Sequence, residues 1–201
     1  YKPGENETAA IGVAVSGLIA SEIREKTLEV WIHVREVPKK GVVFMEIRQQ
    51  SGYRGGSVDG IKFVPGSAKM GSNVPLTTTP LDRPHWANYS IGSFRSEDTG
   101  GEAENLEPGT RVHLVITYRT DGTITIFRNG AVYGKPYTPD TGTAAGLLQA
   151  YRSSDALIRF PVTKSFEIEE ARLYDSVLSE RQVLASFRTG IQNLTIEETL
   201  N

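Results

Sequence analysis

The segment "RVHLVITYRTDGTITIFRNGAVYGKPY", residues 111–137, constrains the fold of this chain more than any other. Apolar residues alternate with polar ones along 112–118 and again along 124–126, which is the period of a β-strand. The dipeptides Asp121-Gly122 and Asn129-Gly130 end the two runs, and both tolerate the positive φ that tight hairpin turns need. The segment therefore predicts a meander of antiparallel strands.

Three further segments have the same character. Residues 26–34, "KTLEVWIHV", alternate in a way that predicts a strand with one buried face. "GVVFMEIRQ" at 41–49 is bounded by Gly41, and "DGIKFV" at 59–64 is entered through Asp59-Gly60. With 201 residues the chain is most simply one domain, because all-β folds often reach about 200 to 250 residues undivided.

One helix is predicted near the end of the chain. Ser179 and Gln182 form a capping box, and Leu178 and Val183 occupy the positions of a hydrophobic staple. Gly190 is a typical helix stop, so we expect a short helix of about ten residues. The domain is accordingly assigned to 1–190, and 191–201 to a tail or linker.

The stretch "FEIEEARLYD", residues 166–175, gathers several acids in a predicted strand. Phe166 and Ile168 have one parity while Ala171 and Leu173 have the other, so a regular strand cannot bury all four on one face. A β-bulge near Glu169 and Glu170 would restore the alignment by adding one residue. We therefore interpret these acids as a feature of strand geometry rather than as a catalytic pair.

Composition excludes several functions. Hydrophobic residues make up 38% of the chain, enough for a substantial core, and a net charge of −2 gives no reason to expect nucleic acid or an anionic membrane as a partner. The absence of cysteine excludes disulfides and thiolate metal sites. No apolar run approaches the roughly 18 residues of a membrane span, so no membrane insertion is expected. The start at Tyr1 suggests a segment of a longer protein.

The order of these elements resembles a known family. "TLEVWIHV", then residues 111–137, then "FEIEEARLYDSVLSERQVLASFRTG" are together similar to the laminin-G-like, or concanavalin A-like lectin/glucanase, jelly roll. The matching positions are Thr27, Leu28, Trp31, His113, Thr117, Tyr118, Asp121, Gly122, Asn129, Gly130, Ile168 to Tyr174, Leu178 and Ser179. The resemblance implies an all-β fold, an antiparallel β-sandwich of jelly-roll type with one short C-terminal helix.

A narrower resemblance concerns location. "REKTLEVWIHV", "VDGIKFVPG", "YRTDGTITIFRNGAVYGKPY" and "ARLYDSVLS" are similar to the jelly-roll domain of large bacterial extracytoplasmic proteins that also carry cytochrome-c-like domains. That domain has no established activity of its own. The resemblance implies a parent protein that is secreted, periplasmic or attached to the cell surface.

The family comparison also sets expectations about chemistry. A glucanase on this fold carries two carboxylates in an E-x-D-x-x-E strand, and no such spacing occurs here, so we expect no enzyme activity. Many laminin-G-like domains hold a structural calcium, for which carboxylate oxygens are suitable ligands. Glu169 stands where relatives have Asp and is the candidate calcium ligand. The histidines at 33, 85 and 113 show no zinc spacing, and His33 and His113 are expected to be half-exposed on their strands.

The candidate ligand-binding residues lie between positions 65 and 110, where Gly, Pro, Ser and Thr predominate and only "HWANYSIGSF" suggests a strand. Arg83, His85, Trp86 and Tyr89 place two aromatic rings among hydrogen-bonding groups, a combination that suits sugars. The alternative is that Trp86 fixes the long loop to the sandwich.

The sequence thus predicts a non-catalytic recognition or interaction module of an extracytoplasmic multidomain bacterial protein, with carbohydrate as the leading partner. Two alternatives stay open. The domain could dock against other domains of its parent, which predicts an exposed apolar patch. A glycoside hydrolase is less favoured, and it predicts two carboxylates facing each other in a cleft.

Overall fold

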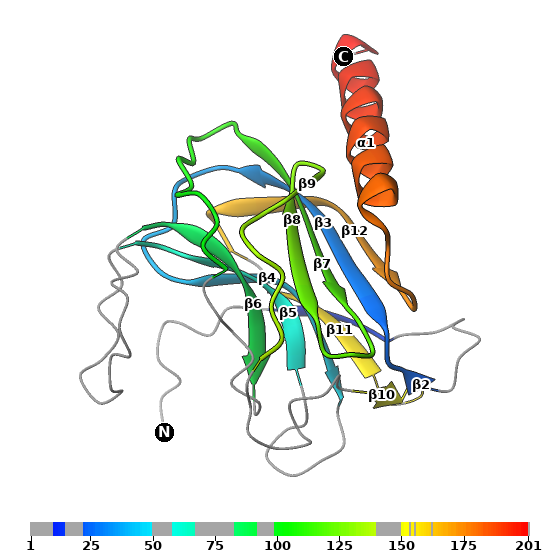
Figure 1. Cartoon of the computed structure of the whole chain (residues 1–201). Helices are drawn as coiled ribbons and strands as arrows, with labels where there is room; N and C mark the ends of the chain where they lie inside the picture. The colour runs from blue at the N-terminus through cyan, green and yellow to red at the C-terminus, as the bar shows by residue number, and fades with distance from the viewer. Residues whose placement is uncertain are drawn as a thin grey trace, which may run out of the picture.

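In the residues that the structure describes, the protein is a sandwich of two five-stranded antiparallel sheets with one helix on the outside of the second sheet (Figure 1). This arrangement is seen in a computed structural model. The structure describes the following residues: 10–14, 22–49, 58–66, 83–91, 99–139, 150–152, 154, 156–161 and 163–200.

Sheet I has the strand order β1-β11-β4-β5-β6. Its strands are β1 (Ala10–Ala14), β11 (Ala156–Pro161), β4 (Val42–Gln49), β5 (Val58–Val64) and β6 (His85–Ile91). The strands predicted at 41–49 and 59–64 are therefore confirmed, and so is the one suggested by "HWANYSIGSF". β5 begins at Val58, one residue before the expected entry at Asp59-Gly60.

Sheet II has the order β12-β3-β7-β8-β9. Its strands are β12 (Phe166–Tyr174), β3 (Lys26–Val34), β7 (Arg111–Tyr118), β8 (Ile124–Arg128) and β9 (Ala131–Val132). The short strands β2 (Glu22–Ile23) and β10 (Tyr151–Arg152) pair with each other beside the sandwich. The predicted meander is confirmed: β7 pairs with β8 and β8 with β9, and Asn129 and Gly130 have φ values of 51° and 81°.

The predicted bulge in the closing strand is confirmed. Along β12, the pairing with β3 runs from Ile168 opposite Ile32 directly to Glu170 opposite Trp31, which leaves Glu169 without a partner. The extra residue switches the parity of the strand. Phe166 and Ile168 before the bulge, and Ala171 and Leu173 after it, all pack on the same core.

The core lies between the sheets and is built from the alternating apolar residues of both. Leu28, Val30 and Ile32 of β3 are fully buried, as are Leu114 and Ile116 of β7. One expectation for β3 is wrong, however: both of its faces are buried, since Glu29 and Trp31 on the outer face have almost no exposed surface. The helix supplies this second cover.

Helix α1 (Glu180–Leu200) begins as predicted. The Gln182 amide donates to Ser179 Oγ at 3.4 Å, and the Ser179 amide donates to Gln182 Oε1 at 2.9 Å, which completes the capping box. Leu178 and Val183 pack in one apolar cluster, as the staple requires. The predicted stop at Gly190 is wrong, because the helix continues to Leu200, where a tail or linker was expected.

Gly190 has a different role. A Cβ at this position would lie 2.7 Å from Cε2 of Trp31 and closer still to Cζ2. The glycine therefore allows α1 to lie directly on the indole ring of Trp31, and the sequence feature that suggested a helix end marks a packing contact instead.

Candidate functional site

Strand alternation places Trp86 on the opposite face of β6 from His85 and Tyr89. Trp86 points into the sandwich, where it is fully buried and its ring centroid lies 5.0 Å from that of Phe63 and 5.6 Å from that of Phe44. From this position its ring cannot stack on a sugar. Its place in the core agrees with the alternative role, that of fixing the chain to the sandwich.

His85 and Arg83 mark the beginning of β6. His85 is 3% exposed, and its Nδ1 lies 3.0 Å from the carbonyl oxygen of Arg83. Arg83 is half-buried and has an interaction of its own. The structure therefore does not bring these two side chains together with Tyr89 into one exposed group.

Tyr89 lies on the outer face of sheet I. It pairs across the ladder with Gly60 of β5, Gly60 pairs with Glu46 of β4, and Glu46 pairs with Arg159 of β11. Residues that pair in this way point to the same face of a sheet. Tyr89, Glu46 and Arg159 thus form one row across four strands, with Gly60 inside it.

Glu46 is the centre of a charged group on this face. Its Oε1 lies 3.2 Å from Nη1 of Arg159 and 3.3 Å from Nη2 of Arg48, which follows two residues later on the same strand. The Glu46 side chain is 5% exposed, whereas those of Arg48 and Arg159 are 27% and 33% exposed. The carboxylate is therefore buried beneath two guanidinium groups that solvent can reach.

The charges of Glu46, Arg48 and Arg159 act on the Tyr89 hydroxyl. Burial raises the pKa of the Tyr89 hydroxyl, and the negative charge of Glu46 raises it further, while Arg48 and Arg159 oppose the shift. The hydroxyl is therefore neutral at physiological pH and can both donate and accept a hydrogen bond.

Gly60 separates Glu46 from Tyr89 in this row and is itself buried. Neighbouring strands lie about 4.8 Å apart, so these two side chains stand roughly 10 Å apart with no side chain between them. A Cβ on Gly60 would lie 2.5 Å from the carbonyl oxygen of Met45 and 3.1 Å from Cα of Glu46. The register shift between Val43 and Met45 accompanies this close approach, which only glycine permits.

We call Glu46, Arg48, Lys62, Tyr89 and Arg159, with Gly60 between them, the sheet I cluster. Lys62 belongs to it because it has the same parity as Gly60 on β5, and burial lowers its pKa. Except for Tyr89, sequence reasoning missed this cluster. The signal available was the pair Glu46 and Arg48 with one residue between them in an apolar strand, but only the cross-strand register joins them to Arg159 and Tyr89.

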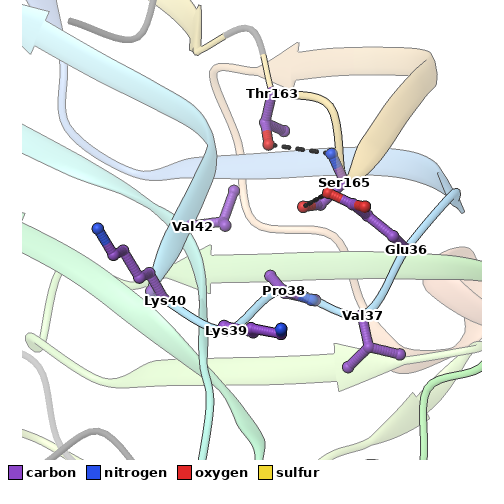
Figure 2. A pocket seen from close by; sticks show the side chains of 9 residues that line it. Glu36, Val37, Pro38, Lys39, Lys40, Val42, Thr163 and Ser165 are labelled. Carbon is purple, nitrogen blue, oxygen red and sulfur yellow. Dashed lines mark hydrogen bonds between the residues drawn. The ribbon is translucent and has the colours of Figure 1, made fainter. Parts of the chain in front are cut away.

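A groove of about 580 Å³ lies elsewhere, along the loop from β3 to β4 (Figure 2). Its lining residues are Glu36 to Val42, Thr163 and Ser165. The Ser165 amide donates to Thr163 Oγ1 at 3.2 Å, and Ser165 Oγ donates to Glu36 at 3.3 Å. In Figure 2 the side chain of Lys40 extends away from these hydroxyls.

Glu169, the candidate calcium ligand, is engaged in an ion pair. Its Oε1 accepts a hydrogen bond from Arg111 Nε at 2.9 Å, and its Oε2 is buried with no donor in the part of the chain that the structure describes. Calcium takes six to eight oxygen ligands. Within the described ranges no three His, Asp or Glu side chains converge on one point, and calcium binding at Glu169 stays a prediction.

A second polar group is buried between α1 and the outer face of sheet II. His113 Nε2 lies 2.7 Å from Glu29 Oε1, Tyr174 donates to Glu29 Oε2 at 2.7 Å, and Ser186 of α1 also donates to Glu29. Arg172 Nη1 lies 3.5 Å from the same carboxylate. The expectation that His113 is half-exposed is wrong: it has no exposed surface, because α1 covers it.

The electrostatics of Glu29 follow from these contacts. Burial alone would raise its pKa, but the hydrogen bonds from His113, Ser186 and Tyr174 lower it to about 2. Ser186 donates to Glu29 rather than to His113, so the group does not have the order of a nucleophile, base and acid. The His113 ring stacks on Trp31 at 4.4 Å, which makes this group part of the attachment of α1.

No helix in the described part of the chain is both long enough and apolar enough to cross a membrane.

Comparisons with solved structures identify the fold. A sialidase of Trypanosoma rangeli is similar over 82% of this chain and 22% of its own, with 15% identity and a TM-score of 0.51. The binding domain of botulinum neurotoxin serotype G is similar over 92% of this chain and 41% of its own, with 12% identity and a TM-score of 0.50. The chain thus spans less than half the length of either structure. No curated protein matches it.

A family model described as the concanavalin A-like lectin/glucanases superfamily, of laminin-G type, matches residues 8–184. This range includes both sheets and the first turn of α1. The chain therefore belongs to the laminin-G-type family of the concanavalin A-like lectin/glucanases superfamily.

Proposed function

We propose that this domain is a non-catalytic carbohydrate-recognition module and that the outer face of sheet I is its binding surface. The observation that carries the proposal is the sheet I cluster. It places a half-buried aromatic ring and two solvent-accessible guanidinium groups around a position without a side chain. A sugar offers an apolar C–H face for the ring and hydroxyls for the charged donors. The family is consistent with such a role.

Two observations favour binding over hydrolysis. Among the described residues on the outer face of sheet I, Glu46 is the sole carboxylate, whereas a glycosidase needs two. Glu46 is also engaged by two arginines, whose Nη atoms lie 3.2 and 3.3 Å from its Oε1. The sugar would be held by stacking and hydrogen bonds, with no covalent step.

The docking alternative receives less support. It predicts a continuous apolar patch, but the large apolar side chains exposed among the described residues are Val37, Val132 and Leu184. Val37 lies in the loop after β3, whereas Val132 lies on β9 and Leu184 on α1, which contacts that strand.

We further propose that the parent protein acts outside the cytoplasm, on the basis of the resemblance to extracytoplasmic bacterial jelly-roll domains.

A glycan array followed by titration calorimetry tests the proposal. We expect the purified domain to bind at least one saccharide class, and Tyr89→Ala to weaken that binding about tenfold, or by about 1.4 kcal/mol, since it removes the ring on which the sugar would stack. Arg119→Ala is the control because Arg119 is exposed on the far sheet, at the turn after β7. No binding across neutral and acidic polysaccharides would overturn the proposal.

A further inference from the structure

We propose that the sheet I cluster selects saccharides that carry a carboxylate, such as chains of hexuronic acid. This inference rests on the proposed function and adds the chemical class of the ligand. The first reason is the charge of the cluster: Arg48, Arg159 and Lys62 are cations, and Glu46 is the one carboxylate among the described residues of this face. The cluster is thus positive although the whole chain has a net charge of −2.

The second reason is unused hydrogen-bonding capacity. Arg48 and Arg159 share one oxygen of Glu46, at 3.3 and 3.2 Å, and a guanidinium has five N–H donors. Arg48 Nε is buried and donates to no acceptor in the described part of the chain. A planar carboxylate would match the guanidinium donors with two parallel hydrogen bonds, which a neutral sugar hydroxyl cannot do.

The third reason is Lys62. Its side chain is partly buried, and no carboxylate pairs with it within the residues that the structure describes. A buried cation without a partner is costly in free energy. Lys62 is two residues from Gly60 on the same face of β5, so a sugar above Gly60 would bring its carboxylate within reach of this ammonium group.

The residues of the sheet I cluster would thus contact different parts of the sugar. Tyr89 on one side of Gly60 would stack on the sugar ring, and the cations on the other sides would bind the carboxylate. A neutral saccharide would offer the cations only hydroxyls and leave them without a counter-charge. We therefore expect discrimination between sugars of one backbone that differ only in charge.

The experiment compares oligogalacturonate with its carboxyl-reduced form, which keeps the backbone and removes the charge. Calorimetry should show that the purified domain binds the acid at least about tenfold more tightly, a difference of about 1.4 kcal/mol. The affinity should fall as NaCl rises from about 50 to about 500 mM, because salt screens charges that solvent reaches. A sulfated oligosaccharide is the third arm.

Variants separate charge from stacking. Arg159→Gln and Lys62→Met should lower affinity for the acid about tenfold and affinity for the reduced sugar much less, whereas Tyr89→Ala should weaken both to a similar extent. Lys62→Met is also expected to stay folded, because removing an unpaired, partly buried charge should not lower the melting temperature. An unchanged melting temperature would show that its loss of affinity does not come from unfolding. Arg119→Gln is the matched control on the other sheet.

The outcomes are distinguishable. Equal affinity for acid and reduced sugar would overturn the inference and leave the proposed function intact. Preference for the sulfated sugar over the carboxylated one would also overturn it, in favour of a sulfate ligand. No binding in any arm would overturn the inference, and no binding on the glycan array as well would overturn the proposed function.

Discussion

Glu29 accepts hydrogen bonds from three elements, β7, β12 and α1, and this sets a pH limit on the attachment of the helix. Its pKa is about 2 in the fold, against an ordinary value of 4.5. A lowered pKa stabilises the fold above the unfolded value and loses this contribution as pH falls. We therefore expect stability to decline between pH about 4.5 and about 2 as Glu29 becomes protonated.

Urea unfolding followed at several pH values checks this prediction. Glu29→Gln should be less stable than the natural chain at pH 7 and should lose less stability on acidification, because it has no carboxylate to protonate there. Glu167→Gln is the matched control: Glu167 lies on the neighbouring strand, is 48% exposed, and pairs with Arg35. An unchanged pH profile in Glu29→Gln would show that other groups set the acid limit.

At the scale of elements, the segments with local signals were predicted from sequence. The hairpin dipeptides fix positive φ, the parity switch in "FEIEEARLYD" requires a bulge, and the capping box needs only residues three apart. Features that depend on packing could not be predicted in this way. The predicted end of α1 was wrong because Gly190 is a packing contact with the Trp31 ring rather than a helix stop, and this contact is formed only in the folded structure.

The candidate site shows the same limit. Alternation alone predicts that Trp86 and Tyr89 lie on opposite faces of one strand. It does not predict which of the two faces packs on the core. The group of Glu46, Arg48 and Arg159 requires the pairing of β4 with β11, whose strands are more than 100 residues apart in the sequence. Long-range register of this kind is not encoded in any local pattern.

The helix itself offers a test in which propensity and packing predict opposite results. Glycine in a helix usually costs about 1 kcal/mol relative to alanine, so Gly190→Ala would ordinarily stabilise α1. Here the added methyl overlaps the indole of Trp31, and we expect destabilisation by about 1 to 3 kcal/mol instead. Thermal unfolding should show a lower melting temperature, and Trp31 fluorescence should shift as the ring becomes exposed.

Two variants sharpen this measurement. Trp86→Phe removes the other of the two tryptophans, so that emission reports on Trp31 alone. Thr189→Ala is the control for the helix, since Thr189 is exposed and adjacent to Gly190. Equal or higher stability in Gly190→Ala would mean that α1 does not lie against the indole.

At the scale of the whole molecule, a buried ion pair joins the two sheets through the core. Lys26 of β3 lies 3.0 Å from Asp59 of β5, and neither side chain has any exposed surface. Tyr151 donates to Asp59 at 2.9 Å, and the Lys26 ammonium lies 4.6 Å from the ring centroid of Tyr118. The pair fixes how one sheet lies on the other, because a shift of either sheet would leave a charge unpaired in the core.

This pair yields a prediction about single and double substitutions. Lys26→Met should destabilise the fold by roughly 3 to 5 kcal/mol, since it leaves the Asp59 carboxylate buried without its counter-charge. The double variant Lys26→Met/Asp59→Asn should recover most of that loss, because no net charge then stays buried. Urea unfolding of the natural chain, both single variants and the double variant gives the coupling energy. Additive effects of the two substitutions would show that the charges act independently, and the sheets would then be held in place by their apolar faces alone.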